Sequence, residues 1–253
     1  TYAMYKSVVK KHIMPYFTEN KCLVKDIDSR YAQRYFNYVY EKKLSNKTVS
    51  NHRGILSSMC HYAISINELN INPLPNIEPP PKSQPLENYF SAKELIQLLN
   101  IVKDTDFWYP VYMAAIYGLR RSEVCGLKWS AVDFENEQFS IRHTLHELPD
   151  DNDHIKVFGK DQTKNKKIKV FPLLDEIELM LTEMKKHQEE LGIYDPSGYV
   201  YIKDDGIPVR PRYVSEHFTV LLKNNNLRHI RYHDLRHSCA SVLLTDHNRS
   251  VSL

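Results

Sequence analysis

The chain has 253 residues, with 34 Lys and Arg against 31 Asp and Glu for a formal net charge of +3, and 42% of its residues are hydrophobic. This is the composition of a globular protein with buried cores, and the length allows one or two domains. Four cysteines without a C-x-x-C pair argue against a zinc ribbon or a disulfide framework and fit a reducing cytoplasm. Because we find neither a signal peptide nor a long apolar run, we expect no export and no membrane span.

Positive charge is concentrated at the front of the chain. Residues 1–88 contain 12 Lys and Arg against seven Asp and Glu, whereas the remainder contains 22 against 24. Amphipathic helices are predicted there over 1–17, 28–43 and 47–66, because apolar side chains recur every three or four residues. Ser45 or Asn46 is the expected N-cap of the third helix. The apolar stripe of that helix consists of Val49, Leu56, Met59, Cys60 and Ala63.

The opposite face of the third helix is polar. It presents Lys47, Thr48, Asn51, His52 and Arg53. Taken singly, each is most simply a solvated side chain. As a set, they combine phosphate donors with side chains that read base edges, as a helix facing a DNA groove needs. The predicted DNA-binding residues are Lys47, Thr48, Asn51 and Arg53.

A proline-rich stretch interrupts the helical pattern. Six prolines between residues 72 and 88 exclude a helix or a central strand and indicate an extended linker. Ser91 and Glu94 then form the capping-box signature with which a new helix begins. We therefore predict a helical domain over 1–75, a linker over 76–90 and a larger mixed domain over 91–253.

The larger domain is predicted to combine helices with short strands. The helices are expected at 91–103, 106–117, 175–191 and 211–225, and the strands at 138–143, 155–158 and 168–171. A lysine-rich turn, residues 160–167, separates the last two strands. The predicted fold class is mainly α with a small antiparallel β-sheet (α+β).

Two arginine motifs stand out in this domain. Arg120 and Glu123 are three residues apart, so a semi-buried carboxylate there would hold the guanidinium rigid, whereas a surface ion pair would contribute little. His233 and Arg236 have the same spacing near a predicted helix start, where unpaired N–H groups and the helix dipole already favour an anion. Taken alone, a His-x-x-Arg is usually surface charge, but next to a helix start it suits a phosphate oxygen.

The sequence lacks the motifs of metal-dependent, serine hydrolase and nucleotide-binding sites. The histidines with spacings that a metal can use are His143 and His146, and His229, His233 and His237. No H-E-x-x-H motif and no carboxylate set accompanies them, and no G-x-S-x-G elbow, P-loop or G-x-G-x-x-G loop occurs. We therefore expect no metal and no cofactor. Two arginines on one phosphate, a lysine that protonates a leaving alkoxide and a histidine that moves a proton would support metal-free chemistry at phosphorus.

The motifs, in this order, resemble the tyrosine recombinase (phage-type integrase) family, most closely the integrases of phages and conjugative transposons. The segment from Gly118 to Trp129 resembles the first arginine box, and the segment from His233 to His237 resembles the second. Lys164, eight residues before Pro172, resembles the β-turn lysine. Lys166 and Lys167 are close competitors for that role. The resemblance covers nearly the whole chain: a helical core-site-binding domain, a linker and a catalytic domain.

The resemblance implies a mechanism. The implied catalytic residues are Arg120, Lys164, His233 and Arg236, supported by Glu123 and His237, with Lys166 and Lys167 as further DNA-binding residues. The arginines would bind the non-bridging oxygens of the scissile phosphate, the lysine would act as general acid, and the histidine would assist proton transfer. A tyrosine would attack the phosphorus to form a 3′-phosphotyrosyl link, without metal or ATP.

The family's nucleophile has no counterpart in this sequence. In the family the tyrosine follows the second box by one or two helices, but no tyrosine follows Tyr232 here, and Tyr232 adjoins His233. We therefore expect a piece of a longer integrase that binds DNA and does not cleave it by itself. The opening of the chain at Thr1, directly in a predicted helix, favours the same interpretation.

The expected partner is double-stranded DNA at a core or attachment site. The resemblance implies a dimer on each site, a tetramer in the synaptic complex and a location in the bacterial cytoplasm, on the nucleoid. Two alternatives stay open. One is a non-catalytic architectural or regulatory DNA-binding protein with the same fold, and the other is a helical protein-interaction domain that does not bind DNA.

Overall fold

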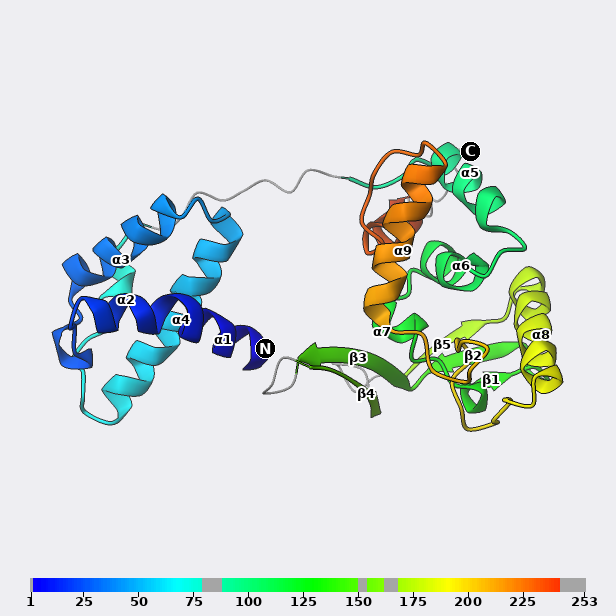
Figure 1. Ribbon diagram of the computed structural model, residues 1–253, viewed down its shortest axis with the longest axis horizontal. Coiled ribbons are helices and arrows are strands. Elements are labelled where there is room, and N and C mark those ends of the chain that lie inside the picture. Colours follow the sequence, from blue (N-terminus) through cyan, green and yellow to red (C-terminus); the bar gives the residue numbers. More distant parts are fainter. Residues whose placement is uncertain (1, 79–87, 150–153, 162–167, 242–253) are drawn as a thin grey trace, which may run out of the picture. The chain divides into compact units, whose positions relative to one another are not determined.

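The computed structural model describes residues 2–78, 88–149, 154–161 and 168–241. The chain divides into two compact units, residues 1–86 and 87–253 (Figure 1). Helices predominate and the strands form small antiparallel sheets, so the predicted α+β class is confirmed. Within the described ranges, no helix is long and apolar enough to cross a membrane.

The first unit begins with one helical run in three parts. α1 (Tyr2–Val8) and α2 (Met14–Glu19) flank a π-helical turn, η1 (Val9–Ile13). Pro15 has no N–H to donate and its ring crowds the carbonyl one turn earlier, so a wider turn directly before it relieves the clash. The predicted helix over 1–17 is present, with a local widening that its apolar periodicity does not reveal.

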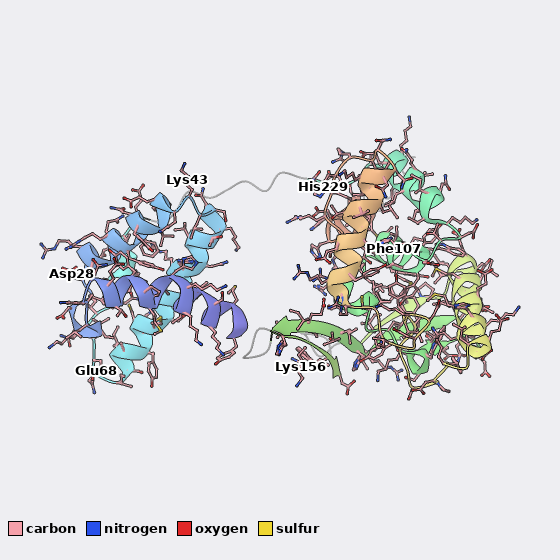
Figure 2. All side chains as sticks on the ribbon, in the orientation of Figure 1. Asp28, Lys43, Glu68, Phe107, Lys156 and His229 are labelled. Carbon is pink, nitrogen blue, oxygen red and sulfur yellow. The ribbon has the colours of Figure 1, made fainter. Side chains whose placement is uncertain are left out.

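Side-chain caps begin the next two helices of the first unit. Its remaining helical elements are η2 (Val24–Asp26), α3 (Ser29–Glu41), α4 (Asn46–Ser65) and η3 (Leu74–Asn76). Asp28, labelled at the start of α3 in Figure 2, accepts the Tyr31 N–H at 2.8 Å. Ser45 accepts the Thr48 N–H at 3.2 Å, which makes it the N-cap of α4. Each oxygen pairs with an N–H that the first helical turn leaves without a backbone partner.

Two side chains of α4 depart from their predicted faces. Met59 was expected in the buried stripe but is 41% exposed. His52 was expected on the polar face but is fully buried, and its Nδ1 lies 2.9 Å from the Tyr35 hydroxyl. Position 52 is three residues after Val49 and four before Leu56, so the helical repeat places it on the buried face. The prediction for His52 was therefore wrong.

Ordered packing extends into both ends of the predicted linker, 76–90. Ile77 is 3% exposed within the core of the first unit, and Phe90 is fully buried in the core of the second. Prolines exclude regular structure, but they do not prevent a single apolar side chain between them from entering a core. Residues 79–87, which carry four of the prolines, lie outside the described ranges.

The second unit places one helix at its centre. Its helices are α5 (Ala92–Val102), α6 (Trp108–Ile116), α7 (Arg121–Val124), η4 (Trp129–Ala131), α8 (Asp175–Glu190) and α9 (Pro211–Asn224), and residues 234–241 are also helical. Every residue of α6 from Trp108 to Ala115 is buried, as is Phe107 just before it, labelled in Figure 2. The capping box predicted at Ser91 and Glu94 is present at the start of α5.

The strands of this unit form two separate sheets. They are β1 (Val132–Asp133), β2 (Gln138–Ile141), β3 (His143–Pro149), β4 (Ile155–Asp161) and β5 (Lys169–Pro172). One antiparallel sheet has the order β1-β2-β5, and β3 pairs with β4 in the other. The single strand predicted over 138–143 is thus two strands that part at Arg142. Alternation along one strand does not specify its partner, so the sequence pattern did not reveal the break.

Candidate functional site

The first arginine box begins in the turn between α6 and α7 and includes α7. Gly118 adopts the left-handed conformation (φ +61°) that turns the chain after α6. Glu123 reaches back from α7: its Oε2 accepts the Arg120 N–H at 2.8 Å, and its Oε1 accepts from Nη1 of Arg120 at 3.1 Å. The side chain of Glu123 is 2% exposed and that of Arg120 is 52% exposed. A buried carboxylate therefore fixes a guanidinium that still faces solvent, which is the semi-buried arrangement and not the surface ion pair.

A lysine absent from the predicted site shares this carboxylate. Nζ of Lys169, at the start of β5, lies 2.7 Å from Oε1 of Glu123. Burial opposes ionisation of Glu123, but the hydrogen bond from Lys169, the N–H of Arg120 and the two positive charges outweigh it and lower the pKa of the carboxyl. The signal was in the predicted strand: alternation places Lys169 on the same face as Phe171, which packs against Tyr117 and Phe139.

The second arginine box touches the first through a backbone carbonyl. Nη1 of Arg236, on the helix over 234–241, donates to the carbonyl of Gly118 at 2.7 Å. A side chain at Gly118 would begin 3.6 Å from Cγ of Arg236. Because Gly118 lies two residues before Arg120, this contact brings the two arginine boxes together. The half-buried Arg236 therefore lies close in the fold to the turn that presents the more exposed Arg120.

Histidines flank Arg236 on the exposed side of the helix. The rings of His233 and His237 are 5.5 Å apart and nearly perpendicular. Desolvation, followed by the neighbouring His237 and Arg236, lowers the pKa of His233. The His233 imidazole is therefore mainly neutral near pH 7, the form that can accept a proton.

Hydrogen bonds made by the buried side chains of Asp234 and Tyr232 fix the start of this helix. Asp234 is 2% exposed, and its carboxylate accepts the N–H of Arg231 at 2.9 Å and the Arg231 guanidinium at 2.8 and 3.0 Å. Tyr232 is 3% exposed and donates its hydroxyl to the carbonyl of Pro110 at 2.5 Å. Burial raises the pKa of the Tyr232 hydroxyl well above its usual value. Tyr232 is therefore a core residue, unsuited to act as a nucleophile.

A cleft of about 590 Å³ opens beside the first box. Its wall includes Arg120, Arg121, His146, Ser215, Arg231 and His233. Three arginines in the wall of an open cleft favour a polyanion, and guanidinium forks match the geometry of phosphate oxygens. Within the described ranges, no group of three His, Cys, Asp or Glu side chains is placed to hold a metal ion.

The predicted lysines of the turn, Lys164, Lys166 and Lys167, lie outside the described residues. The strands on either side are described: β4 ends at Asp161 and β5 begins at Lys169. The role of each turn lysine therefore stays a prediction.

The predicted DNA-binding residues of α4 are of two kinds: some are at least partly exposed, and one is bonded within the fold. Lys47 is exposed, and Thr48 and Asn51 are half-buried. Arg53 instead donates from Nη2 to the carbonyl of Leu74 at 2.6 Å and from Nη1 to that of Ile77 at 2.9 Å. These bonds fasten η3 and the residues after it to α4, so the guanidinium of Arg53 is already engaged within the fold.

Comparison with known proteins matches both units. Residues 88–248 match the phage integrase family, and residues 1–79 match the phage integrase SAM-like domain. The chain is 25% identical over 250 residues to the ICEBs1 integrase of Bacillus subtilis (strain 168), covering 96% of this chain and 66% of that protein. It is also 25% identical over 236 residues to a XerC-like tyrosine recombinase of Caldanaerobacter subterraneus subsp. tengcongensis, covering 86% of this chain and 60% of that protein. The chain thus spans about two thirds or less of these relatives.

Solved structures share the fold. The Tn1549 transposon integrase (residues 82–397), in complex with circular intermediate DNA, matches with a TM-score of 0.73 at 18% identity, covering 96% of this chain and 86% of that chain. A lambda integrase (75–356) dimer bound to a COC′ core site matches with a TM-score of 0.63 at 18% identity, covering 86% of this chain and 73% of that chain. A lambda integrase tetramer bound to a Holliday junction gives 0.62 at 18% identity, covering 86% and 60%.

Proposed function

Since this chain belongs to the phage integrase family of tyrosine recombinases, we propose that it is the core-site-binding and catalytic portion of a site-specific DNA recombinase. The observation that carries the proposal is the bond from Arg236 to the carbonyl of Gly118, because it joins the second arginine box to the loop that presents Arg120. Arg120 lines the cleft, and Arg236 is bonded to the turn that precedes Arg120, so the two guanidinium groups suit the charge that develops on a phosphodiester during cleavage.

Each side chain of the site takes a defined part in the reaction. Arg120 and Arg236 bind the non-bridging oxygens of the scissile phosphate. His233, whose lowered pKa keeps it mainly neutral near pH 7, accepts a proton from the attacking hydroxyl. Lys164 protonates the leaving 5′ oxygen, with Lys166 and Lys167 as competitors for this role or as DNA contacts. Glu123 orients Arg120, and His237 packs against His233.

The attacking tyrosine is proposed to lie outside these 253 residues. No tyrosine follows Tyr232 in the sequence, and Tyr232 itself is buried with its hydroxyl engaged. Attack by an incoming tyrosine would leave a 3′-phosphotyrosyl bond whose energy drives rejoining, so no nucleotide is required.

The proposed partner is duplex DNA held by both units. Lys47, Thr48 and Asn51 of α4 supply phosphate and base contacts in the first unit, while Arg53 acts indirectly by fastening η3 to that helix. The lambda integrase complexes contain a dimer on a core site and a tetramer on a Holliday junction. By analogy, we propose a dimer on each site and a tetramer in the synapse, acting on nucleoid DNA in the bacterial cytoplasm.

Replacement of Arg120 tests the catalytic proposal. In the full-length parent protein, Arg120→Ala should lower recombination by about 100-fold or more, the scale of losing one transition-state donor, while most DNA affinity remains. Lys186→Ala is the matched control, since Lys186 forms an exposed i,i+4 pair with Glu190 on α8. Recombination by Arg120→Ala at the wild-type rate would overturn the site assignment.

A non-catalytic DNA-binding protein of the same fold is the second candidate, favoured by the burial of Tyr232, whose hydroxyl is bonded to the carbonyl of Pro110. Incubation of the full-length parent with nicked duplex DNA separates the two: covalent protein–DNA product supports the recombinase, and reversible binding alone supports the second candidate. Both require DNA affinity that falls with salt, with a log–log slope of about −0.9 per phosphate contact. A flat salt response would instead favour a protein-interaction domain.

A further inference from the structure

Lys169 is placed to act on the arginine box from another part of the fold. It lies 46 positions after Glu123 in sequence, and its Nζ contacts the same oxygen, Oε1, that accepts from Arg120. The backbone of Lys169 is held independently, because β5 pairs with β2 in a register that sets Lys169 opposite Ile141. The ammonium group is therefore delivered to Glu123 by the sheet, and not by the helix that carries the carboxylate.

We propose that Lys169 is a positioning residue that acts through Glu123 to keep the Arg120 guanidinium available to the phosphate. This inference rests on the proposed recombinase function and adds a residue to its site.

The reason is electrostatic: Lys169 and Arg120 compete for the carboxylate of Glu123. Glu123 is 2% exposed, and a carboxylate that is nearly desolvated requires cationic or N–H partners. With Lys169 at 2.7 Å, Glu123 takes only one guanidinium nitrogen, Nη1, among the contacts of the described residues. The remaining N–H groups of Arg120 are then left for a phosphate. Without Lys169, Arg120 would be the one cation beside Glu123 among the described residues, and the carboxylate would draw the guanidinium away from the cleft.

The geometry also distinguishes positioning from direct chemistry. The side chain of Lys169 is 33% exposed and ends on a carboxylate, whereas that of Arg120 is 52% exposed and lines the cleft. Arginine at position 169 could keep an ion pair with Glu123, but with its very high pKa it could not serve as a general acid. The two roles therefore predict opposite results for one conservative substitution.

The test compares three variants in the full-length parent protein. Lys169→Met removes the charge, Lys169→Arg keeps it, and Lys156→Met is the control, because Lys156 is exposed on β4 (Figure 2). DNA affinity and the single-turnover rate of covalent cleavage on nicked duplex DNA are measured for each. We expect Lys169→Met to lower the cleavage rate by about 100-fold, the effect of a small misplacement of a reacting group, with little change in affinity. Lys169→Arg should recover most of the rate, and Lys156→Met should cleave as the wild type does.

A double-mutant cycle tests the route through Glu123. If Lys169 acts through the carboxylate, combining Lys169→Met with Glu123→Gln should slow cleavage no more than Glu123→Gln alone. Wild-type cleavage by Lys169→Met, equal loss in Lys169→Met and Lys169→Arg, or additive losses in the cycle would each overturn the proposal. If the wild-type parent forms no covalent product, both the recombinase proposal and this inference are overturned. If the wild type cleaves and only the variants behave otherwise than expected, this inference alone is overturned.

Discussion

A single glycine sets how closely the first arginine box approaches the β3–β4 hairpin. A Cβ at Gly126 would lie 2.5 Å from Cα of Thr144 and 2.6 Å from N of Leu145, both on β3. These are backbone atoms, which cannot rotate away as a side chain can. The position therefore requires glycine for contact with the strand, although its backbone conformation is open to other residues.

Two alanine substitutions at glycines should have opposite effects on stability. Gly126→Ala should lower the free energy of unfolding of the second unit by about 1–3 kcal/mol, because the methyl group overpacks against backbone. Gly54→Ala should raise that of the first unit by about 0.5–1 kcal/mol, because Gly54 lies within α4 with nothing within 4 Å of its Cβ position. Urea unfolding followed by circular dichroism measures both. A stabilising Gly126→Ala would contradict the close contact with β3.

At the scale of elements, Arg228 connects the first residues of the second unit to its helices. Arg228 donates to both carboxylate oxygens of Glu94 on α5, at 2.9 and 3.2 Å, and to Asn88 and the carbonyl of Tyr89, each at 2.7 Å. The next residue, Phe90, donates its N–H to the buried hydroxyl of Ser238 at 2.9 Å. The segment that follows the linker is thus hydrogen-bonded to the helix that carries Arg236.

The Arg228–Glu94 pair should make the second unit sensitive to acid. The hydrogen bond from Arg228 is the main cause that lowers the pKa of Glu94 from 4.5 to about 2. A carboxyl group whose pKa is lowered by folding stabilises the folded unit above pH 4.5. This stabilisation is lost as the pH falls toward 2. Arg228→Met should therefore destabilise the unit at neutral pH, and its difference from wild type should shrink as pH falls through this window. Urea unfolding monitored by tryptophan fluorescence measures this, since Trp108 and Trp129 both lie in the second unit.

Lys186→Met on α8 is the control for this measurement, because the pair of Lys186 with Glu190 is exposed on both sides. It should change stability little at any pH. A difference between Arg228→Met and wild type that stayed constant from neutral pH into the acid range would show that the guanidinium acts through packing and not through the charge of Glu94.

At the scale of the whole molecule, the two units carry different tasks and different titrating groups. Lys and Arg outnumber Asp and Glu in the first unit, whereas the second has slightly more Asp and Glu than Lys and Arg and holds the arginine boxes. In the first unit, His52 is fully buried between the Tyr35 hydroxyl and the ring of His12, whose centroid lies 4.9 Å away. Its Nε2 has no hydrogen-bond partner among the described residues.

The first unit should therefore lose stability in mild acid. Desolvation and the neighbouring His12 lower the pKa of His52 from its usual 6.5. A histidine whose pKa is lowered by folding does not change the free energy of unfolding above pH 6.5. As the pH falls below 6.5 that free energy decreases, because the unfolded chain takes up the proton first. The pH dependence should appear in a thermal transition seen by circular dichroism but not by tryptophan fluorescence.

Substitution of His52 tests this assignment. His52→Gln, which keeps an acceptor for Tyr35, should flatten the pH dependence of the first transition, whereas His61→Gln, at an exposed position on the same helix, should leave it unchanged. An unaltered pH profile in His52→Gln would mean that another group is responsible.

The sequence by itself determined the approximate positions of the longer helices, the capping box at Ser91 and the two arginine boxes, and it narrowed the cap of α4 to Ser45 or Asn46. Apolar periodicity places α3, α4, α8 and α9, and the caps at Ser45 and Ser91 involve atoms within three residues of each other. Such signals are local, so they are readable without a fold. The order of the boxes carried the family resemblance, which the matches over 1–79 and 88–248 confirm.

Only the tertiary structure decided which of these residues meet. The contacts of Lys169 with Glu123, of Arg236 with Gly118 and of Arg53 with carbonyls in and just after η3 each join positions more than 20 apart in sequence. The division of one predicted strand at Arg142 likewise depends on partner strands far along the chain. Contacts of this kind arise from packing between elements, and periodicity within an element contains no information about which neighbour its exposed or buried polar groups will find.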